Sequence, residues 1–306
     1  MFQDHLMQGQ RILVTGGGTG LGRAMAQRFL SLGADVAICG RRQSVCEEAA
    51  AAWREQFPTR RVDTFTLDIR DAQKVEDMVQ DLFASGGLTG LVNNAAGNFI
   101  APTESLSPRA FDAVANIVLH GTFYVTQAIG RRWVAQARAQ EWRRGQPCRN
   151  VLSIITTWVD NGGPYVVPSA MSKAGVEVMT RSLAVEWAPF GIRLNAVGPG
   201  EFPTEGMNAR LFPGEEPGSR TRASNPMGRV GEMQELQNLA AFLMSPGTCD
   251  WLTGQSIMLD GAGALANGGN FYELRQWTDA DWQRARAAIE ARNQQDRQLR
   301  AKGEGA

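Results

Sequence analysis

The chain has 306 residues, enough to bury a large hydrophobic core in one or two domains. Its 31 basic and 31 acidic residues cancel, so no overall charge favours nucleic acid or an anionic membrane surface, and we expect a small-molecule partner. Four cysteines without C-x-x-C spacing, two histidines, and the lack of a long apolar run or a targeting pattern indicate a cytoplasmic protein with no metal site and no membrane association.

Short apolar runs rich in β-branched residues alternate with helical patterns along the chain. The predicted strands are residues 11–15, 35–39, 62–67, 90–95, 150–155, 192–197 and 256–260. Such alternation predicts a parallel sheet covered on both faces, which is a doubly wound α/β fold of the Rossmann type.

We expect a single domain over residues 1–262, followed by a C-terminal extension, residues 263–306, with one helix. That helix opens near Thr278 and is predicted to dock through Trp282, Ala285 and Ile289, which share one face. Closely spaced prolines and glycines between residues 201 and 229 predict a mobile excursion beside a cleft, which is a candidate lid.

The first predicted strand runs into the glycine-rich stretch TGGGTGLG. Gly16, Gly20 and Gly22 separate this strand from a helix, so that backbone N–H groups can approach a pyrophosphate at the helix N-terminus. The second strand ends in CGRR, where an NAD-selective site usually carries an acid. Arg41 and Arg42 suit a 2′-phosphate and favour NADP(H), the alternative being a solvated basic turn.

Four motifs together resemble the short-chain dehydrogenase/reductase family over residues 10–262: the glycine turn, VNNAAG at 92–97, S-x-x-x-K ending at Lys173, and VGPG at 197–200. The stretches NNAAGNFIAPTESLSP, VVPSAMSKAGVEVMTRSLAVEW and FYELRQWTDADW are most similar to the 2,4-dienoyl-CoA reductases. This resemblance implies an acyl-CoA substrate and a homotetramer with interfaces on the two long helices around residues 111–137 and 169–187.

The turn, the arginines and the resemblance together give a set of expected contacts. Asp68 resembles the family's adenine-binding acid, and Lys173 resembles the lysine that holds the nicotinamide ribose. The predicted cofactor contacts are Gly16, Thr19, Gly20, Leu21, Gly22, Arg41, Arg42, Asp68, Ile69, Asn94, Ala95, Ala96, Lys173, Pro199 and Gly200. The substrate contacts that the resemblance implies are Arg70, Phe99, Ser107 and Arg210.

The family's catalytic tyrosine is missing from both of its usual places. The common pattern puts it four residues before the lysine, where this chain has Ser169, and the dienoyl-CoA reductases put it fifteen residues before, where this chain has Trp158. Tyr165 stands eight residues before Lys173, a spacing that takes it off the lysine's helical face. We interpret Tyr165 as a packing residue and as a reserve acid if its loop folds back.

This substitution bears on the reaction. Ketone reduction makes an alkoxide that needs a proton on oxygen, and an indole N–H does not act as an acid near neutral pH. Hydride addition to an unsaturated thioester needs only donors that stabilise an enolate oxygen, and Asn98, Ser169 and Trp158 are candidates. The structural alternatives are that Asn98 caps a turn, Ser169 is a helix N-cap and Trp158 is a pocket wall.

The sequence therefore predicts an NADPH-dependent reductase of a C=C bond in an unsaturated fatty acyl-CoA, either a 2,4-dienoyl-CoA or a trans-2-enoyl-CoA. The predicted catalytic residues are Lys173, Ser169, Asn98, Trp158 and Tyr165. The alternatives are a carbonyl reductase that uses Tyr165 and an NADP-binding protein without turnover.

Overall fold

The computed structural model describes residues 2–139, 148–204, 216–267, 274 and 276–303. Seven parallel strands form one sheet in the order β3-β2-β1-β4-β5-β6-β7. The strands are β1 Arg11–Thr15, β2 Asp35–Gly40, β3 Val62–Thr66, β4 Gly90–Asn93, β5 Arg149–Ile154, β6 Ile192–Pro199 and β7 Ser256–Leu259. The predicted doubly wound α/β fold is confirmed, and each predicted strand is present with its ends shifted by at most two residues.

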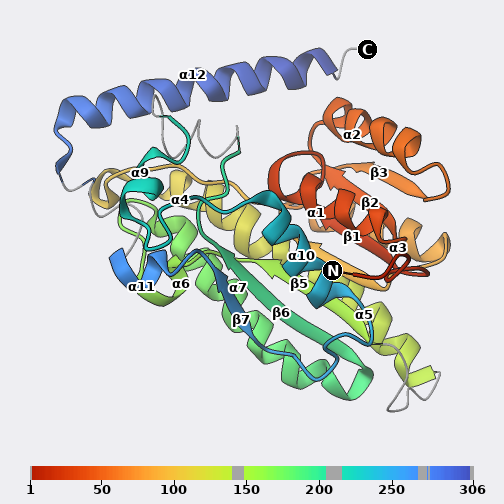
Figure 1. The fold of residues 1–306 in the computed structure, drawn as a ribbon. Coiled ribbons are helices and arrows are strands. Elements are labelled where there is room, and N and C mark those ends of the chain that lie inside the picture. The colour runs from red at the N-terminus through yellow and green to blue at the C-terminus, as the bar shows by residue number, and fades with distance from the viewer. Residues whose placement is uncertain (1, 140–147, 205–215, 268–273, 275, 304–306) are drawn as a thin grey trace.

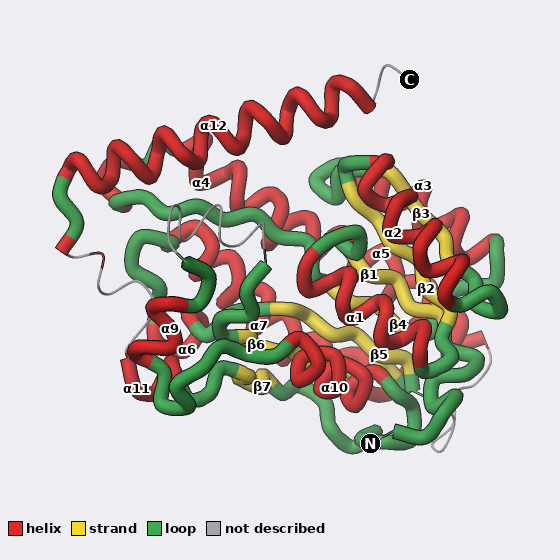
Figure 2. Tube along the Cα trace, turned by 45° about the horizontal axis from the view of Figure 1, so that its top comes forward, coloured by secondary structure: helices red, strands yellow, loops and turns green. Residues whose placement is uncertain are grey.

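Helices cover both faces of this sheet (Figures 1 and 2). The helices are α1 Gly20–Ser31, α2 Gln43–Gln56, α3 Ala72–Ala84, α4 Pro108–Ala115, α5 Thr122–Ala139, α6 Trp158–Asn161, α7 Val167–Trp187, α9 Ser219–Ser224, α10 Met233–Met244, α11 Gly263–Asn267 and α12 Asp279–Gly303. The described residues also form the 3-10 turns η1 Thr103–Ser105 and η3 Ala188–Phe190 and the π-helical turn η2 Asn116–Gly121. One face of the sheet packs against α1, α2 and α10, and the other against α3, α5 and α7.

The strands read as continuous apolar runs because both of their faces are buried. In β1, Ile12 and Val14 belong to the hydrophobic cluster under α1, α2 and α10, whereas Leu13 between them belongs to the cluster under α3, α5 and α7. Since successive side chains of a strand point to opposite faces, an alternating apolar and polar pattern would leave one face of this sheet unfilled.

The strand order reverses between β1 and β4. From β1 the chain moves outward through β2 to β3, then crosses back to β4 and continues to β7 at the other edge. In open parallel sheets, ligands bind beyond the carboxyl ends of the strands at such a switch point. The residues that follow β1 and β4 therefore define where a site is expected.

Two segments have features that the sequence did not predict. The expected continuous helix over 111–137 is interrupted at η2, which is a π-helical turn between α4 and α5. The expected mobile excursion between residues 201 and 229 begins with buried Glu201 and Phe202 and contains α9, whose Thr221 donates a hydrogen bond to the Glu201 carboxylate. Residues 205–215 of that excursion lie outside the described residues.

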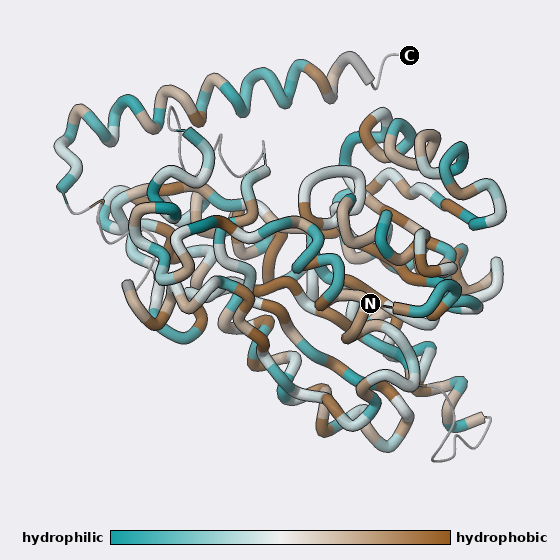
Figure 3. Tube along the Cα trace, viewed as in Figure 1, coloured by the Kyte–Doolittle hydropathy of each residue, from teal (hydrophilic) through white to brown (hydrophobic). Residues whose placement is uncertain are grey.

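The last helix, α12, lies along one end of the molecule, outside the three layers (Figure 1). Most of its residues are hydrophilic (Figure 3). As predicted, its docking face consists of Trp282, Ala285 and Ile289, which are at most 9% exposed. A bilayer-spanning helix, judged by length and apolar character, is absent from the described residues.

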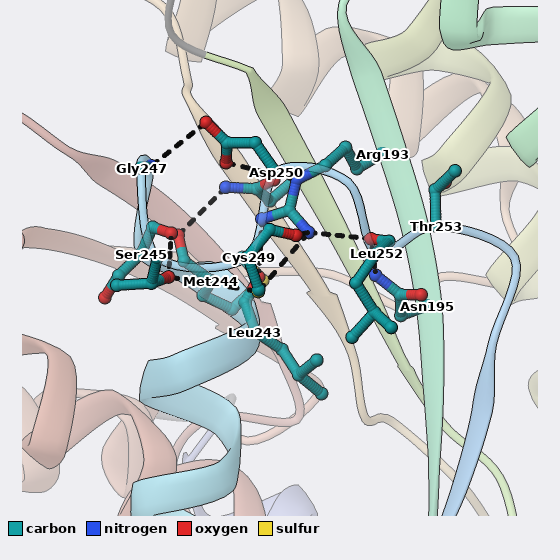
Figure 4. Close-up of polar contacts among 12 residues, drawn as sticks. Arg193, Asn195, Leu243, Met244, Ser245, Gly247, Cys249, Asp250, Leu252 and Thr253 are labelled. Atoms are coloured by element: carbon teal, nitrogen blue, oxygen red, sulfur yellow. Dashed lines mark hydrogen bonds and ion pairs between the residues drawn. The ribbon is translucent and has the colours of Figure 1, made fainter.

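The end of the sheet away from the switch point contains a buried arginine (Figure 4). Arg193, near the start of β6, donates hydrogen bonds to the carbonyl oxygens of Leu243, Cys249 and Leu252 at 2.9–3.1 Å. Its Nε also lies 3.5 Å from an Asp250 carboxylate oxygen. These contacts fix the connection between α10 and β7, so we interpret Arg193 as structural.

Candidate active site

The switch point is cross-linked by Thr15, the last residue of β1. Its Oγ1 accepts hydrogen bonds from the backbone N–H groups of Asn94 and Ala95, both at 3.0 Å. In return, Asn94 Nδ2 donates to the carbonyl oxygens of Thr15 and Gly16 at 3.0 and 3.3 Å. The predicted residues Gly16, Asn94 and Ala95 are thus brought together, and Thr15, which the sequence analysis did not single out, holds them.

The glycine turn has no room for side chains on its inner side. A Cβ on Gly22 would lie 2.5 Å from Asn94 Nδ2 and 2.6 Å from the Gly16 carbonyl oxygen. Gly16 and Gly20 also have positive φ angles, +64° and +53°, which favour glycine. The turn therefore exposes backbone at the N-terminus of α1, where Thr19 is the N-cap and Leu21 follows in the first turn.

Thr204 is a second residue that the sequence analysis missed. A Cβ on Gly20 would lie 3.6 Å from Thr204 Cγ2, so the segment after β6 comes next to the glycine turn. The predicted residues Pro199 and Gly200 lead into this segment, and Gly200 donates its N–H to the Leu259 carbonyl oxygen at 2.9 Å. The close approach of Asp260 Cα, 2.8 Å from a Cβ on Gly200, explains the glycine there.

Charged residues gather beyond the ends of β2 and β3. Asp68 accepts hydrogen bonds from Arg70 Nε and Nη2 at 2.9 and 2.6 Å. Burial acts to raise the pKa of Asp68, but the hydrogen bonds and charge of Arg70 and the charge of Arg41 outweigh burial and lower it. Arg70, expected at the substrate, is therefore brought together with the predicted cofactor residues Asp68 and Arg41, and Arg42 follows as the N-cap of α2.

Lys173 lies in α7 and reaches the end of β5. Its side chain is 6% exposed, and its Nζ donates to the Ile154 carbonyl oxygen. Burial disfavours the charged form and lowers the pKa of Lys173 from 10.5 to about 8. A lysine poised in this way can hold hydroxyl groups or supply positive charge near neutral pH.

The three expected oxyanion donors lie in segments that follow β4 and β5. Trp158 is 8% exposed and opens α6, four residues beyond the strand end where the dienoyl-CoA reductase pattern implies the tyrosine. Ser169 is 4% exposed and lies inside the first turn of α7, whose N-cap is Val166, so the N-cap interpretation of Ser169 is wrong. Asn98 accepts the Phe99 N–H through Oδ1 at 2.9 Å, which leaves its Nδ2 as the group it can offer to a ligand.

Tyr165 is a packing residue in this structure, as its default interpretation holds. Its ring lies against that of Trp282 at a centroid distance of 4.8 Å, within a hydrophobic cluster that also contains Trp158 and Phe99. Of the other expected substrate contacts, Ser107 is the N-cap of α4 and accepts the Ala110 N–H at 3.2 Å. Arg210 lies outside the described residues.

The π-helical turn η2 was also missed, because its residues continue the helical pattern of their neighbours. It packs between α7 and the predicted cofactor residue Ile69: a Cβ on Gly121 would lie 2.6 Å from Ile69 Cγ1, and one on Gly175 would lie 2.8 Å from Leu119. Such turns often occur at functional sites, and this one borders the helix that carries Lys173.

These features fit a dinucleotide. The bare turn at a helix N-terminus suits a pyrophosphate, exposed Ala96 and half-buried Asn94 continue the same edge, and buried Lys173 lies farther along it. Among the described residues, no three or more His, Cys, Asp or Glu side chains form a group that could hold a metal ion.

Comparisons with known proteins agree with this geometry. A family model described as enoyl-(acyl carrier protein) reductase matches residues 16–262. An uncharacterized oxidoreductase of Caenorhabditis elegans is 44% identical over 293 residues, which cover 94% of this chain and 90% of the relative. A probable 2,4-dienoyl-CoA reductase of the same organism is 40% identical, over 92% of this chain and 90% of the relative. A probable 2,4-dienoyl-CoA reductase of Bacillus subtilis is 38% identical, over 83% of this chain and 96% of the relative.

Solved structures place the fold in the same group. A short-chain dehydrogenase from Bacillus anthracis is 37% identical with a TM-score of 0.73, and the match covers 85% of this chain and 99% of that one. A gluconate 5-dehydrogenase from Burkholderia cenocepacia, solved in complex with NADP and tartrate, is 28% identical with a TM-score of 0.76, over 85% and 96% of the two chains. From its family match, its relatives and its strand order, the chain belongs to the short-chain dehydrogenase/reductase family of nicotinamide-dependent oxidoreductases.

Proposed function

We propose that the protein uses NADPH to reduce a carbon–carbon double bond in an unsaturated fatty acyl-CoA, as a 2,4-dienoyl-CoA or trans-2-enoyl-CoA reductase of fatty acid metabolism. The observation that carries this proposal is the packing of the Tyr165 ring on Trp282, which gives the phenol nearest Lys173 in sequence a structural role. The relatives named 2,4-dienoyl-CoA reductases, at 38–40% identity, support it.

Bound NADPH would supply a hydride to the acyl chain. The residues of this chain would then act on the negative charge that reaches the thioester oxygen. Asn98 Nδ2 and the Ser169 hydroxyl are donors for that oxygen, and the Lys173 ammonium adds positive charge from the same end of β5. The enolate takes its final proton on carbon, which water can supply, so no side chain has to act as the acid.

The choice of NADPH over NADH rests on Arg41 and Arg42. They follow the end of β2, and the charge of Arg41 already acts on Asp68 at the neighbouring strand end. A 2′-phosphate placed there would meet guanidinium groups that can pair with it bidentately.

We also propose a homotetramer. Large apolar side chains are exposed on the two long helices named above: Phe123 of α5 is 49% exposed, and Met171, Val178 and Val185 of α7 are 58%, 59% and 79% exposed. The three residues of α7 are spaced by seven and form one stripe, which an interface between copies would cover. A cytoplasmic location stays a prediction from the sequence.

The test is NADPH oxidation with crotonyl-CoA, a 2,4-hexadienoyl-CoA and a β-ketoacyl-CoA. We expect turnover with an unsaturated substrate and none with the ketone. Tyr165→Phe should keep most of the activity, whereas Asn98→Ala and Lys173→Ala should each lose far more. Turnover of the ketone alone, abolished by Tyr165→Phe with NADPH binding intact, would establish carbonyl reduction instead. Silence with all three substrates would favour an NADP-binding protein without turnover.

A further inference from the structure

The last helix of the chain packs onto the segments that carry the candidate active site. The hydrophobic cluster there, which we call the tail cluster, is separate from the two clusters beside the sheet. It joins Phe99 and Ile100 after β4, Trp158 of α6, Tyr165 and Val166 before α7, and Leu274, Trp277, Trp282, Ala285 and Ile289 of the C-terminal extension. The extension is thus built into the surroundings of the site.

Trp282 stands at the centre of the tail cluster. The centroid of its ring lies 4.8 Å from that of Tyr165 and 4.8 Å from that of Trp277, with interplanar angles of 46° and 62°. Both distances are in the range of favourable aromatic pairs. At 7% exposure, Trp282 is nearly covered, so its indole forms a fixed surface for Tyr165.

Tyr165 needs such support because its backbone is in the left-handed region, with a φ of +64°. Residues with a side chain seldom adopt this conformation, and it persists only where the surroundings hold it. Two contacts hold Tyr165: its ring packs on Trp282, and its carbonyl oxygen accepts the Ala101 N–H at 2.9 Å. The second contact ties it to the segment of Asn98 and Phe99.

The loop that contains Tyr165 connects Trp158 to Ser169. Its conformation therefore sets how these two side chains lie relative to each other and, through Ala101, relative to Asn98. We propose that Trp282 is a positioning residue for the acyl substrate: it holds Tyr165 in its left-handed conformation. In this way it keeps Asn98, Trp158 and Ser169 in the relative positions that the acyl substrate requires. This inference rests on the proposed function for the identity of the substrate.

The experiment compares Trp282→Ala with Trp251→Ala in the full-length protein. Trp251 is 94% exposed and lies outside the tail cluster, so its variant controls for the loss of a tryptophan. Amide hydrogen exchange reads the coupling without any substrate. In Trp282→Ala, peptides that contain Ala101 or residues 163–170 should exchange about tenfold faster or more, because the support of Tyr165 is lost. Peptides of β1 and β4, and every peptide of Trp251→Ala, should keep their rates.

Kinetics then separates positioning from general damage. In Trp282→Ala the KM for a dienoyl-CoA should rise about fivefold or more, with the Kd for NADPH unchanged. Trp282→Phe, which keeps a ring beside Tyr165, should restore most of the lost affinity. Should Trp282→Ala fail to fold, Trp282→Leu removes the ring contact while keeping apolar volume.

Unchanged exchange at Ala101 in Trp282→Ala would overturn the inference. Faster exchange with an unchanged KM would overturn the role in substrate positioning. If the exchange is faster but the unmodified protein reduces no unsaturated acyl-CoA, the coupling of Trp282 to the loop stands and the proposed function fails.

Discussion

Replacing Lys173 by Met should stabilise the folded protein near neutral pH while weakening NADPH binding. Burial lowers the pKa of Lys173 from 10.5 to about 8, so the folded state disfavours its proton. At pH 7 this difference of about 2.5 units costs about 3 kcal/mol of stability, an upper value because the Ile154 contact is lost in the variant.

The sign of the pH dependence follows from the two pKa values. Between pH 8 and 10.5 the unfolded chain binds more protons at Lys173 than the folded chain, so this residue's contribution to stability rises with pH. Above pH 10.5 Lys173 is neutral in both states and its burial costs no stability, and as pH falls through about 8 this stability is lost.

Urea unfolding of the unmodified protein and of Lys173→Met at two pH values isolates this term. Because all other groups titrate alike in both proteins, the stability gap between them should narrow by about 1.3 kcal/mol from pH 7 to pH 9. A gap that does not change with pH would show that Lys173 is not desolvated in the free protein, and would refute the reasoning. A stability gap that widens from pH 7 to pH 9 would mean that folding raises the pKa of Lys173 instead of lowering it.

Other variants test separate parts of the site. Arg41→Ala should raise the Kd for NADPH about tenfold or more and leave the Kd for NADH unchanged, since a charge-assisted hydrogen bond contributes about 1.5–3 kcal/mol. Fluorescence titration measures both Kd values, and Arg54→Ala, at an exposed arginine, is the control. An equal loss of affinity for the two cofactors would show that Arg41 does not bind the 2′-phosphate. Thr15→Val should lower the free energy of unfolding by about 1–3 kcal/mol, because the N–H groups of Asn94 and Ala95 lose their acceptor. An unchanged urea unfolding curve would contradict the stabilising role of these two hydrogen bonds. Val178→Asp should split the oligomer in light scattering, whereas Leu299→Asp on α12 should not, and a tetramer that survives the first change would exclude this face of α7.

The sequence predicted the structure well at positions where a local physical requirement restricts which residue types can stand there. Each buried parallel strand needs apolar side chains on both faces, so the strands predicted at 11–15 and 192–197 could be located from their apolar runs, although the second one extends to Pro199. The glycine turn was equally clear, since a side chain at Gly22 would meet Asn94. The role of Lys173 was implied by the resemblance of S-x-x-x-K to the family motif.

Pairings between distant segments could not be read in this way. Tyr165 and Trp282 are far apart in sequence, and no periodic pattern links a loop tyrosine to a face of the last helix. Arg70 pairs with Asp68 two residues away, a local contact that its implied place at the substrate did not indicate. The π-helical turn at Asn116–Gly121 was missed for another reason, since its residues continue the helical pattern of their neighbours.

The order of the strands also determines when the two halves of the site can form during synthesis. β1 to β4 occupy residues 11–93, so the half around the glycine turn, apart from Thr204, is complete in sequence after less than a third of the chain has been made. The half around Lys173 needs β5, α7 and β6, and its covering helix begins only at Asp279. A nascent chain that folds from its N-terminus would therefore gain a nucleotide-binding surface early and its acyl-binding surface last. Ribosome-bound chains halted before α12 should accordingly be competent to bind NADPH before they are competent to reduce a substrate.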